Sequence, residues 1–261
     1  MPLTFFPDLR VNAELSGPPD GAPLVFLHAL GTSLRIWDDV VPHLPNHRIL
    51  RVDMRGHGLT DVPPAPYAMG TLIRDAERMM DHFGLKDAVV VGLSIGGLIA
   101  QGLATKRLDL VRGMVLSNTA ARIGIESQWH ARIDAVRAGG LAAVVDATME
   151  RWFGRHWRDQ PAMPRYREIF LATAPEGWMG AAAALAGTDF YTQTAALGLP
   201  TLAIAGANDG STPPDLVRET ADLIRGSRFH LIRGAGHVPM AEKPHDYAQI
   251  ISQFLTEIGH G

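Results

Sequence analysis

The sequence predicts an α/β fold in which a mostly parallel central sheet is flanked by helices and carries an inserted helical cap. Three observations support this fold class. Short apolar runs rich in β-branched residues alternate with longer stretches of helical character. These runs are continuously apolar, which is typical of parallel strands covered on both faces. After the fourth run, a long segment rich in Ala and Arg contains no clear strand.

The elements follow in order along the chain. The N-terminal stretch 4–15 is expected to supply antiparallel edge strands. Apolar runs predict the strands of the main sheet, at 23–27, 48–53, 88–92, 113–117, 200–206 and 228–232. Between the second and third runs, residues 69–84 have the pattern of a helix. That helix is expected to end at Gly84, because glycine is common where helices stop.

The strand-free segment 122–188 divides the predicted core into two parts, 1–121 and 189–261. It contains four of the five tryptophans, at Trp129, Trp152, Trp157 and Trp178. Open α/β sheets bind ligands at the carboxyl ends of their strands, and an insertion after a strand is placed to cover that edge. We therefore predict that this segment is a helical lid that selects the substrate.

The composition excludes several classes of function. The chain has 261 residues, no cysteine and a formal net charge of −3. Without cysteine there are no disulfides, thiolate nucleophiles or zinc–thiolate sites, and we expect no metal and no cofactor. The charge balance disfavours a nucleic-acid partner. No secretory leader and no bilayer-spanning apolar run is evident, so we expect a cytoplasmic protein without a membrane partner.

A candidate nucleophile lies in the pentapeptide Gly92-Leu93-Ser94-Ile95-Gly96, which fits the pattern G-x-S-x-G. It follows an apolar strand and opens an apolar helix, as the nucleophile elbow of a serine hydrolase requires. Glycine at 92 and 96 removes Cβ atoms that would clash in so tight a turn. The alternative interpretation is a glycine-rich turn with an incidental serine.

A serine hydroxyl becomes a good nucleophile only when a base takes its proton. In this arrangement the chain order is serine, acid, histidine. Asp209 follows the strand at 200–206, and His237 lies in a glycine-rich loop after the strand at 228–232. His237 would act as general base and then general acid, and Asp209 would hold its tautomer. Alone, Asp209 is typical of a turn and His237 of a surface or packed residue; their joint placement at strand ends favours catalysis.

Several segments together resemble successive landmarks of the α/β-hydrolase superfamily, over nearly the whole chain: "LHALGTS", "DMRGHG" (53–58), "GLSIGG", "GANDGSTP" and "GAGHVPMAEKP". Haloalkane dehalogenases and epoxide hydrolases carry aspartate at the elbow, where this chain has Ser94. One departure is Ala29, where the usual loop has His-Gly; it crowds the loop without removing an amide. In that superfamily the 53–58 segment is mainly structural, so Arg55 and His57 are assigned no chemistry.

The resemblance also implies the donors of an oxyanion hole. One is the backbone N–H of Ile95, directly after the nucleophile. The other is the N–H of Leu30, in the loop that follows the strand at 23–27. The alternative is that this loop is an ordinary tight turn between a strand and a helix.

The cap segments carry a narrower resemblance, to the 3-oxoadipate enol-lactonases of aromatic catabolism. The similar segments are "LSNTAARIG" (116–124), "WHARIDAVRAGGL" (129–141), "RWF" (151–153) and "APEGW" (174–178). That family implies opening of an enol-lactone to 3-oxoadipate in the β-ketoadipate pathway. Ser94 would attack the ring carbonyl, His237 would protonate the enolate leaving group, and water would release the acyl enzyme.

The implied substrate is a small anionic lactone, and its carboxylate needs a cation because an unpaired buried charge is very costly. Arg132 is our candidate, since a guanidinium offers forked donors to a carboxylate. Trp129 and Trp152 would shape the wall of the pocket. The alternative is that Arg132 lies on the solvated face of a cap helix and that the tryptophans form the core of the cap.

Two further functions stay open at this point. Within the same fold, a general carboxylesterase, a carbon–carbon bond hydrolase or a cofactor-free haloperoxidase would share the triad, which cannot separate them. In another class, a non-catalytic ligand receptor would bind without turnover. A panel of neutral and anionic substrates distinguishes the first group, and a burst of product from an activated ester excludes the second.

Overall fold

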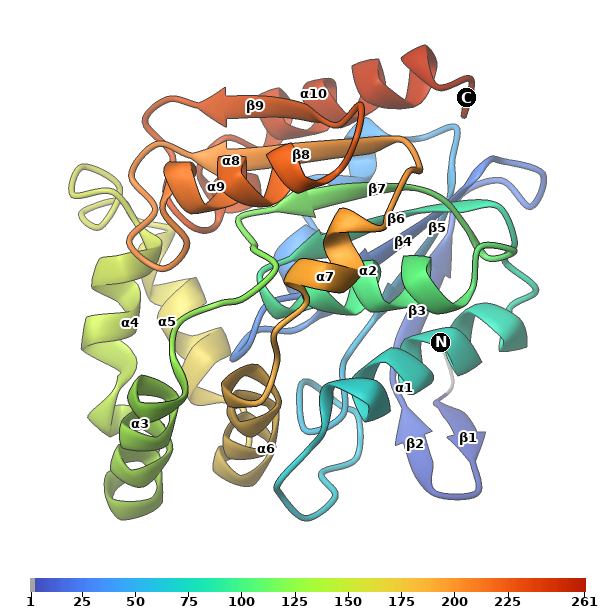
Figure 1. Cartoon of the computed structure of the whole chain (residues 1–261). Helices are drawn as coiled ribbons and strands as arrows, with labels where there is room; N and C mark the ends of the chain where they lie inside the picture. Colours follow the sequence, from blue (N-terminus) through green and yellow to red (C-terminus); the bar gives the residue numbers. More distant parts are fainter. Residues whose placement is uncertain (1–2) are drawn as a thin grey trace.

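The computed structural model describes residues 3–261 and contains a seven-stranded sheet (Figure 1). The strand order is β3-β5-β4-β6-β7-β8-β9, and β3 pairs antiparallel to β5 while the other pairs are parallel. The strands are β3 (Ala13–Ser16), β4 (Pro23–Leu27), β5 (Arg48–Val52), β6 (Ala88–Leu93), β7 (Val111–Ser117), β8 (Thr201–Gly206) and β9 (Arg228–Ile232). All six strands predicted for the main sheet are therefore present.

The last strand, β9, departs from the expectation that the strands are covered on both faces. Arg228, His230 and Leu231 are exposed, and Ile232 is buried. Since β9 is the edge of the sheet, it has one strand neighbour, and helix α8 (Pro214–Leu223) packs against one of its faces. Apolar character in this run therefore did not mean burial on both sides.

The N-terminal stretch is also arranged differently from the prediction. Strands β1 (Thr4–Phe6) and β2 (Leu9–Val11) pair as a separate two-stranded sheet, and only β3 becomes an edge of the main sheet. The hairpin is fastened to a helix, because Arg78 pairs with Asp8 at 2.6 Å and lies over the ring of Phe6 at 4.0 Å. These contacts between distant residues leave no signal in the local pattern.

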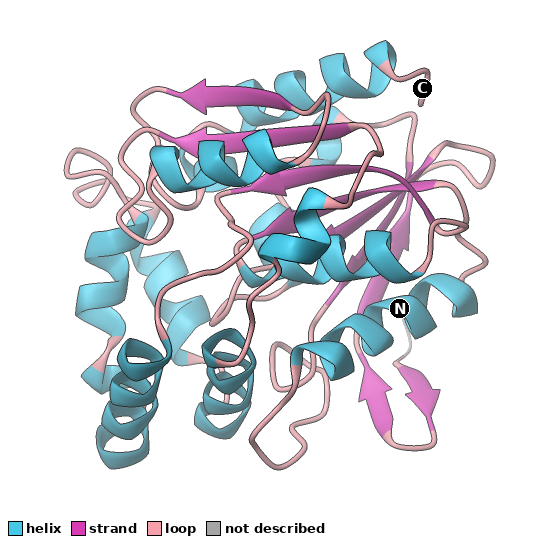
Figure 2. Cartoon of the chain, viewed as in Figure 1, coloured by secondary structure: helices cyan, strands magenta, loops and turns pink. Residues whose placement is uncertain are grey.

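Helices cover both faces of the sheet (Figures 1 and 2). Helices α1 (Met69–His82), α2 (Ile95–Lys106) and α8 lie on one face, and α10 (Pro244–Glu257) lies on the other. The helix predicted at 69–84 is present as α1, and Gly84 follows it in the left-handed conformation with φ 62°. Helix α2 is almost wholly buried because it packs against the central strands β4, β6 and β7.

Between β7 and β8 the described chain contains helices and no strand. These helices are α3 (Glu126–Gly139), α4 (Val145–Trp152), α5 (Met163–Leu171), α6 (Pro175–Ala186) and the short α7 (Tyr191–Ala195). Figure 1 shows α3 to α6 grouped on the side toward which β8 and β9 point. All four tryptophans of this region are buried. The segment thus has the helical character expected of a cap, and its bounds at 122 and 188 stay a prediction.

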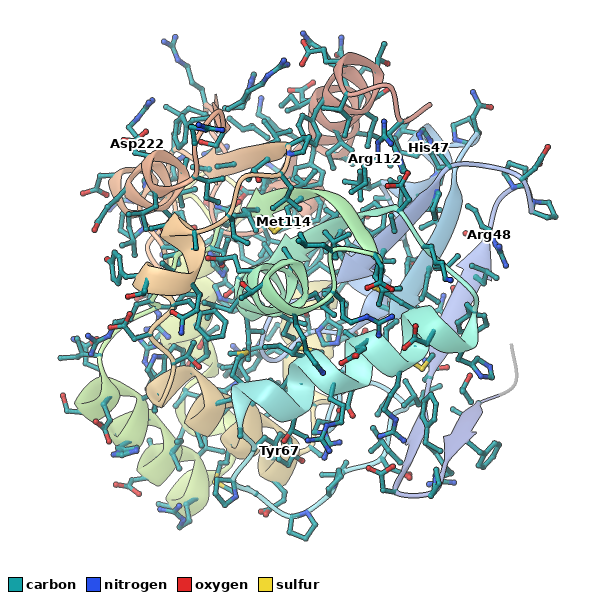
Figure 3. All side chains as sticks on the ribbon, turned by 45° about the vertical axis from the view of Figure 1, so that its right-hand side comes forward. His47, Arg48, Tyr67, Arg112, Met114 and Asp222 are labelled. Atoms are coloured by element: carbon teal, nitrogen blue, oxygen red, sulfur yellow. The ribbon has the colours of Figure 1, made fainter. Side chains whose placement is uncertain are left out.

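Hydrogen bonds connect distant segments both near the cap, at Tyr67, and at the opposite end of the molecule, at Arg112 (Figure 3). At the cap, the backbone N–H of Tyr67 donates to the Gly180 carbonyl of α6 at 3.1 Å. Far from the cap, Arg112 donates to the Ile258 carbonyl at 2.9 Å, after the end of α10.

Among the described helices none alone is long and apolar enough to cross a membrane; α5 and α6 meet that test only as a pair, which is bent by 91°.

Candidate active site

Ser94 occupies the turn between β6 and α2, as the pattern predicted. Its backbone has φ 56° and ψ −117°, an uncommon region for a residue other than glycine. A Cβ at position 92 would overlap the carbonyl of Gly96, and a Cβ at 96 would overlap the carbonyl of Leu27. Glycine is required at both positions by close backbone approach, and the turn holds the serine hydroxyl at the wall of a cavity.

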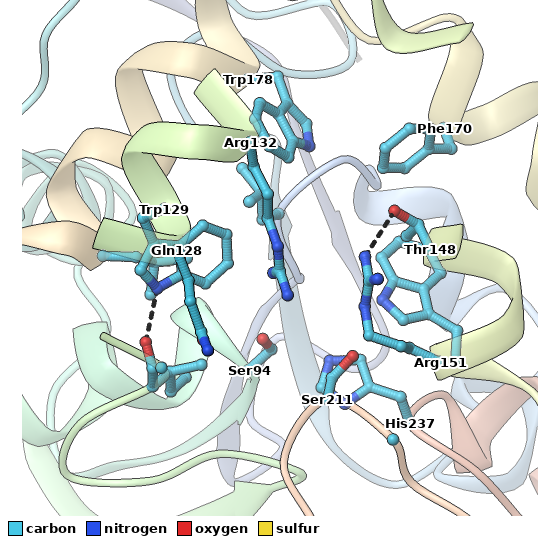
Figure 4. Close-up of a pocket in the computed structure, with 16 residues that line it drawn as sticks. Ser94, Gln128, Trp129, Arg132, Thr148, Arg151, Phe170, Trp178, Ser211 and His237 are labelled. Atoms are coloured by element: carbon cyan, nitrogen blue, oxygen red, sulfur yellow. Dashed lines mark hydrogen bonds between the residues drawn. The ribbon is translucent and has the colours of Figure 1, made fainter. Parts of the chain in front are cut away.

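That cavity has a volume of about 170 Å³ and is bounded by the core on one side and by the cap helices on the other. Figure 4 shows Ser94 and His237 at the same end of it. Both are largely buried, with 6% and 2% of their surface exposed. The structure therefore brings together a serine and a histidine that are 143 positions apart in the sequence.

Asp209 lies directly behind His237. The Nδ1–H of His237 donates to Asp209 Oδ2 at 2.8 Å, which leaves Nε2 as the ring nitrogen available to a hydroxyl. The same carboxylate oxygen accepts from the Thr212 hydroxyl and from the Asn118 amide, both at 2.8 Å. The other oxygen accepts from the backbone N–H groups of Ser211 and Thr212. The carboxylate is held in one orientation by these donors.

The charge of Asp209 is maintained by the same contacts. Burial by itself would raise the pKa of this carboxyl group. His237, Asn118 and the backbone of Thr212 act in the opposite direction and hold the pKa below its usual value. Asp209 is therefore ionised at neutral pH and can stabilise a positive charge on His237.

The two backbone donors predicted for an oxyanion hole are open. Among residues 3–261, no group accepts a hydrogen bond from the N–H of Leu30 or from the N–H of Ile95. Leu30 lines the cavity, and Ile95 begins α2 directly after Ser94. An oxyanion hole needs unpaired backbone donors of this kind, and the assignment of Leu30 and Ile95 to one stays a prediction.

Two buried histidines brace the loop that carries Leu30. His57 Nε2 accepts from the backbone N–H of Gly31 at 3.0 Å, and His28 Nε2 accepts from the N–H of Met54 at 3.0 Å. Burial lowers the pKa of His28 to about 4; burial and the neighbouring His28 lower the pKa of His57 to about 3. Both rings are neutral acceptors at pH 7. The sequence indicated a structural role for the loop of His57, but not that His57 holds the loop of Leu30.

The predicted substrate-binding residues all line the cavity. The Arg132 guanidinium lies 4.7 Å from the ring centre of Trp129, whose indole N–H donates to the Ile123 carbonyl at 2.6 Å. Trp152 stacks on His237 with ring centres 6.0 Å apart. Arg132 is half-buried and lines the cavity, and its role as the cation for a substrate carboxylate stays a prediction. Trp129 and Trp152 belong to the buried core and also line the wall of the cavity.

Several lining residues were not expected from the sequence. They include a second arginine and the aromatic residues that close the cavity opposite Ser94, namely Arg151, Phe170 and Trp178. Trp178 is buried, and its indole N–H has no partner within the described chain. Arg151 directly precedes the predicted Trp152, and this adjacency was a usable signal. Phe170 and Trp178 reach the cavity only through the packing of α5 and α6.

The end of α4 is hydrogen-bonded to the loops of both Asp209 and His237. The Arg151 carbonyl accepts from the N–H of Gly210 at 2.9 Å, and the Trp152 carbonyl accepts from the N–H of His237 at 2.7 Å. Nearby, Glu242 of α9 (Pro239–Glu242) accepts from the N–H of Gly236 at 2.5 Å. These hydrogen bonds fasten the end of α4 to the loops of Asp209 and His237. No cluster of three potential metal ligands was found among residues 3–261.

Comparison with known proteins finds similar sequences and structures that belong to one family. Residues 22–244 match the family described by the alpha/beta hydrolase fold. The 3-oxoadipate enol-lactonases 1 and 2 of Acinetobacter baylyi are each 30% identical over 95% of this chain and 94% of theirs. The crystal structure of the enol-lactonase from Burkholderia xenovorans has a TM-score of 0.94, with 30% identity over 98% of this chain and all of that one.

A thermophilic esterase from Thermogutta terrifontis, with malate bound, has a TM-score of 0.91 and 28% identity, and the match covers 98% of this chain and 97% of that one. The relatives thus include esterases as well as lactonases. The strand order of the sheet, the turn at Ser94 and the family match over residues 22–244 all indicate the same family. The chain belongs to the α/β-hydrolase family.

Proposed function

We propose that this protein opens 3-oxoadipate enol-lactone to 3-oxoadipate, as a serine hydrolase of the β-ketoadipate pathway. The observation that carries the catalytic part is the His237–Asp209 hydrogen bond at the cavity that Ser94 lines. The relatives named as 3-oxoadipate enol-lactonases and the predicted cation, Arg132, in the cavity wall support the choice of substrate.

The proposed reaction has two halves. Ser94 Oγ attacks the ring carbonyl while His237 Nε2 takes its proton, and the oxyanion accepts hydrogen bonds from Leu30 and Ile95. Collapse breaks the ring C–O bond, and His237 returns the proton to the departing enolate, which becomes the ketone. Water, activated by His237, then attacks the acyl enzyme and releases the second carboxylate.

The binding part of the proposal assigns the substrate carboxylate to Arg132, with Trp129 and Trp152 as apolar walls. The malate bound in the structure of the related esterase supports a small acid as the ligand of this cavity. A general carboxylesterase is the second candidate, since that relative is also an esterase. A strong preference for neutral esters over the anionic lactone would favour it.

The direct test is the loss of the ultraviolet absorbance of the enol-lactone in the presence of purified protein. Ser94→Ala is expected to lower the rate at least about 1,000-fold, because no other hydroxyl occupies the elbow. Ser211→Ala is the matched control: Ser211 also lines the cavity, but it holds Asp209 through its backbone N–H. We expect this variant to stay within about tenfold of wild type. Equal rates for wild type and Ser94→Ala would end the assignment.

A further inference from the structure

Two guanidinium groups, not one, enter the cavity above Ser94. Arg132 reaches in from α3 and Arg151 from α4. Figure 4 shows the Arg132 side chain directed toward Ser94, while the Arg151 side chain passes Ser211 and turns its guanidinium toward Thr148. Both are half-buried, so neither charge is fully solvated.

Each of these groups has only a neutral partner. The Arg132 guanidinium rests on the Trp129 ring, and Arg151 Nη2 donates to the Thr148 hydroxyl at 3.2 Å. Across residues 3–261, neither forms a salt bridge with a carboxylate. The contrast on the same helix is Arg137, which is exposed and pairs with Asp134.

The two charges also act on each other. Burial lowers the pKa of both groups, and the charge of Arg132 lowers the pKa of Arg151 further, against a smaller opposite effect of Glu150. Two partly desolvated cations without an anion are unfavourable. A carboxylate between them would remove the repulsion and fill the unused N–H donors with charge-assisted hydrogen bonds.

We propose that Arg151 and Arg132 bind one substrate carboxylate between them, and that Arg151 thereby determines specificity for small anionic acyl substrates over neutral ones. This inference rests on the proposed hydrolysis at Ser94, but it does not require one particular lactone. It adds a second cation, from a different helix, to the one expected from the sequence.

The position of Arg151 explains how such binding would orient the reacting carbonyl. Its own carbonyl is held by Gly210, next to Asp209, and the following carbonyl is held by His237. The guanidinium is therefore mounted on a segment fixed relative to the acid and the base. A carboxylate bound there would place the rest of a small substrate at a set distance from Ser94.

The experiment compares two lactones that differ in one group. The first is 3-oxoadipate enol-lactone, and the second is α-angelica lactone, the same enol-lactone ring with methyl in place of the carboxymethyl group. For wild type we expect a higher kcat/KM with the anionic lactone. Arg151→Gln and Arg132→Gln should each lower the ratio of the two kcat/KM values by about 10- to 100-fold.

Three further variants sharpen the result. The double variant should lose less than the product of the two single losses, because both groups bind the same carboxylate. Arg151→Lys should retain part of the preference, since it keeps a charge without the fork. Arg137→Gln, which removes an exposed charge of α3 outside the cavity, should leave the ratio unchanged. Circular dichroism checks that each variant is folded.

The outcomes separate this inference from the proposed function. If wild type opens the anionic lactone and Arg151→Gln keeps the wild-type ratio, or loses both activities equally, the specificity role is overturned. If wild type does not open that lactone, the proposed function fails, and monomethyl glutarate and methyl pentanoate replace the two lactones. A preference for the glutarate ester that Arg151→Gln abolishes then supports the anion site; equal rates, or no hydrolysis of either ester, overturn it.

Discussion

Asp209 shows how single side chains are set for their task in this molecule. It is almost fully buried, yet it keeps its charge because every donor around it points at the carboxylate. The burial that would neutralise an isolated carboxyl group here strengthens its interaction with His237.

Replacing Asp209 by asparagine tests this arrangement. The amide keeps the size but loses the charge, and its N–H₂ group cannot accept the proton of His237 Nδ1. We expect kcat on the enol-lactone to fall by about 1,000- to 10,000-fold with little change in KM. Asp222→Asn, at an exposed position of α8, is the control and should retain full activity. A modest effect of Asp209→Asn would show that the carboxylate is not needed.

Glu242 is a second residue whose surroundings change its titration. Burial raises its pKa to about 7, against the opposing hydrogen bonds from Gly236 and Gly154. In the unfolded chain the group ionises near its ordinary pKa of 4.5. The folded state therefore loses stability as pH rises from about 4.5 through 7, and the loss is complete above pH 7.

Glu242→Gln removes this dependence and keeps an acceptor for Gly236. Relative to wild type, we expect the variant to gain about 1–2 kcal/mol in free energy of unfolding at pH 8 and almost nothing at pH 4.5, a value reduced for partial exposure. Urea unfolding of wild type and variant at the two pH values measures this difference in free energy of unfolding. An equal difference at both pH values would contradict the raised pKa.

At the scale of the element, the turn from β6 into α2 is the most constrained part of the chain. Ser94 adopts its strained backbone because the flanking segments approach too closely for side chains at 92 and 96. The segment that Gly96 faces is the end of β4, which leads into the loop of Leu30. The proposed nucleophile and the proposed oxyanion donor Leu30 are therefore coupled through the close packing at Gly96.

Gly96→Ala should disturb both at once. Its new methyl group would overlap the carbonyls of Leu27 and His28, so we expect a loss of about 1–3 kcal/mol in unfolding free energy together with lower activity. Gly70→Ala is the matched control in α1, where no atom lies within 4 Å of the added group. That change should stabilise the protein by about 0.5–1 kcal/mol. Thermal unfolding of both variants compares them, and equal midpoints would contradict the close approach.

Elements were predictable where local pattern and packing agree. The central strands β4 to β8 are buried on both sides, so continuous apolar runs identified them closely. The pairing of β1 with β2 and the exposure of β9 depend on which segments lie at the edge of the sheet. Ser94, Asp209 and His237 were found from a turn motif and strand ends, whereas Arg151 and Glu242 acquire their contacts only through the docking of the cap and loops.

At the scale of the whole molecule, two buried histidines link the fold to pH. His28 and His57 stay neutral in the folded state down to about pH 4 and about pH 3, while the unfolded chain takes up protons below about pH 6.5. Their contribution to stability is complete above pH 6.5 and is lost as pH falls toward the folded values.

This predicts an acid-sensitive fold. Each ring costs about 1.4 kcal/mol per pH unit below 6.5, so the two rings together should lower the free energy of unfolding by about 4 kcal/mol from pH 7 to pH 5, and the opposite effect of Glu242 offsets about 1–2 kcal/mol of this. His57→Gln should roughly halve the contribution of the two rings, because one of the two proton uptakes is removed. Urea unfolding across pH 5 to 7.5 gives the slope. A wild-type stability that does not change over this range would contradict neutral burial of the pair.

The central claim is that Ser94, activated by His237, performs the hydrolysis, and covalent labelling tests it most directly. Diethyl 4-nitrophenyl phosphate transfers a diethylphosphoryl group to an activated serine. Peptide mass spectrometry should find one such group, on Ser94, with enol-lactone opening lost in proportion to labelling and no label in His237→Ala. Full activity after complete labelling of Ser94, or loss of activity with Ser94 unlabelled, would contradict the account.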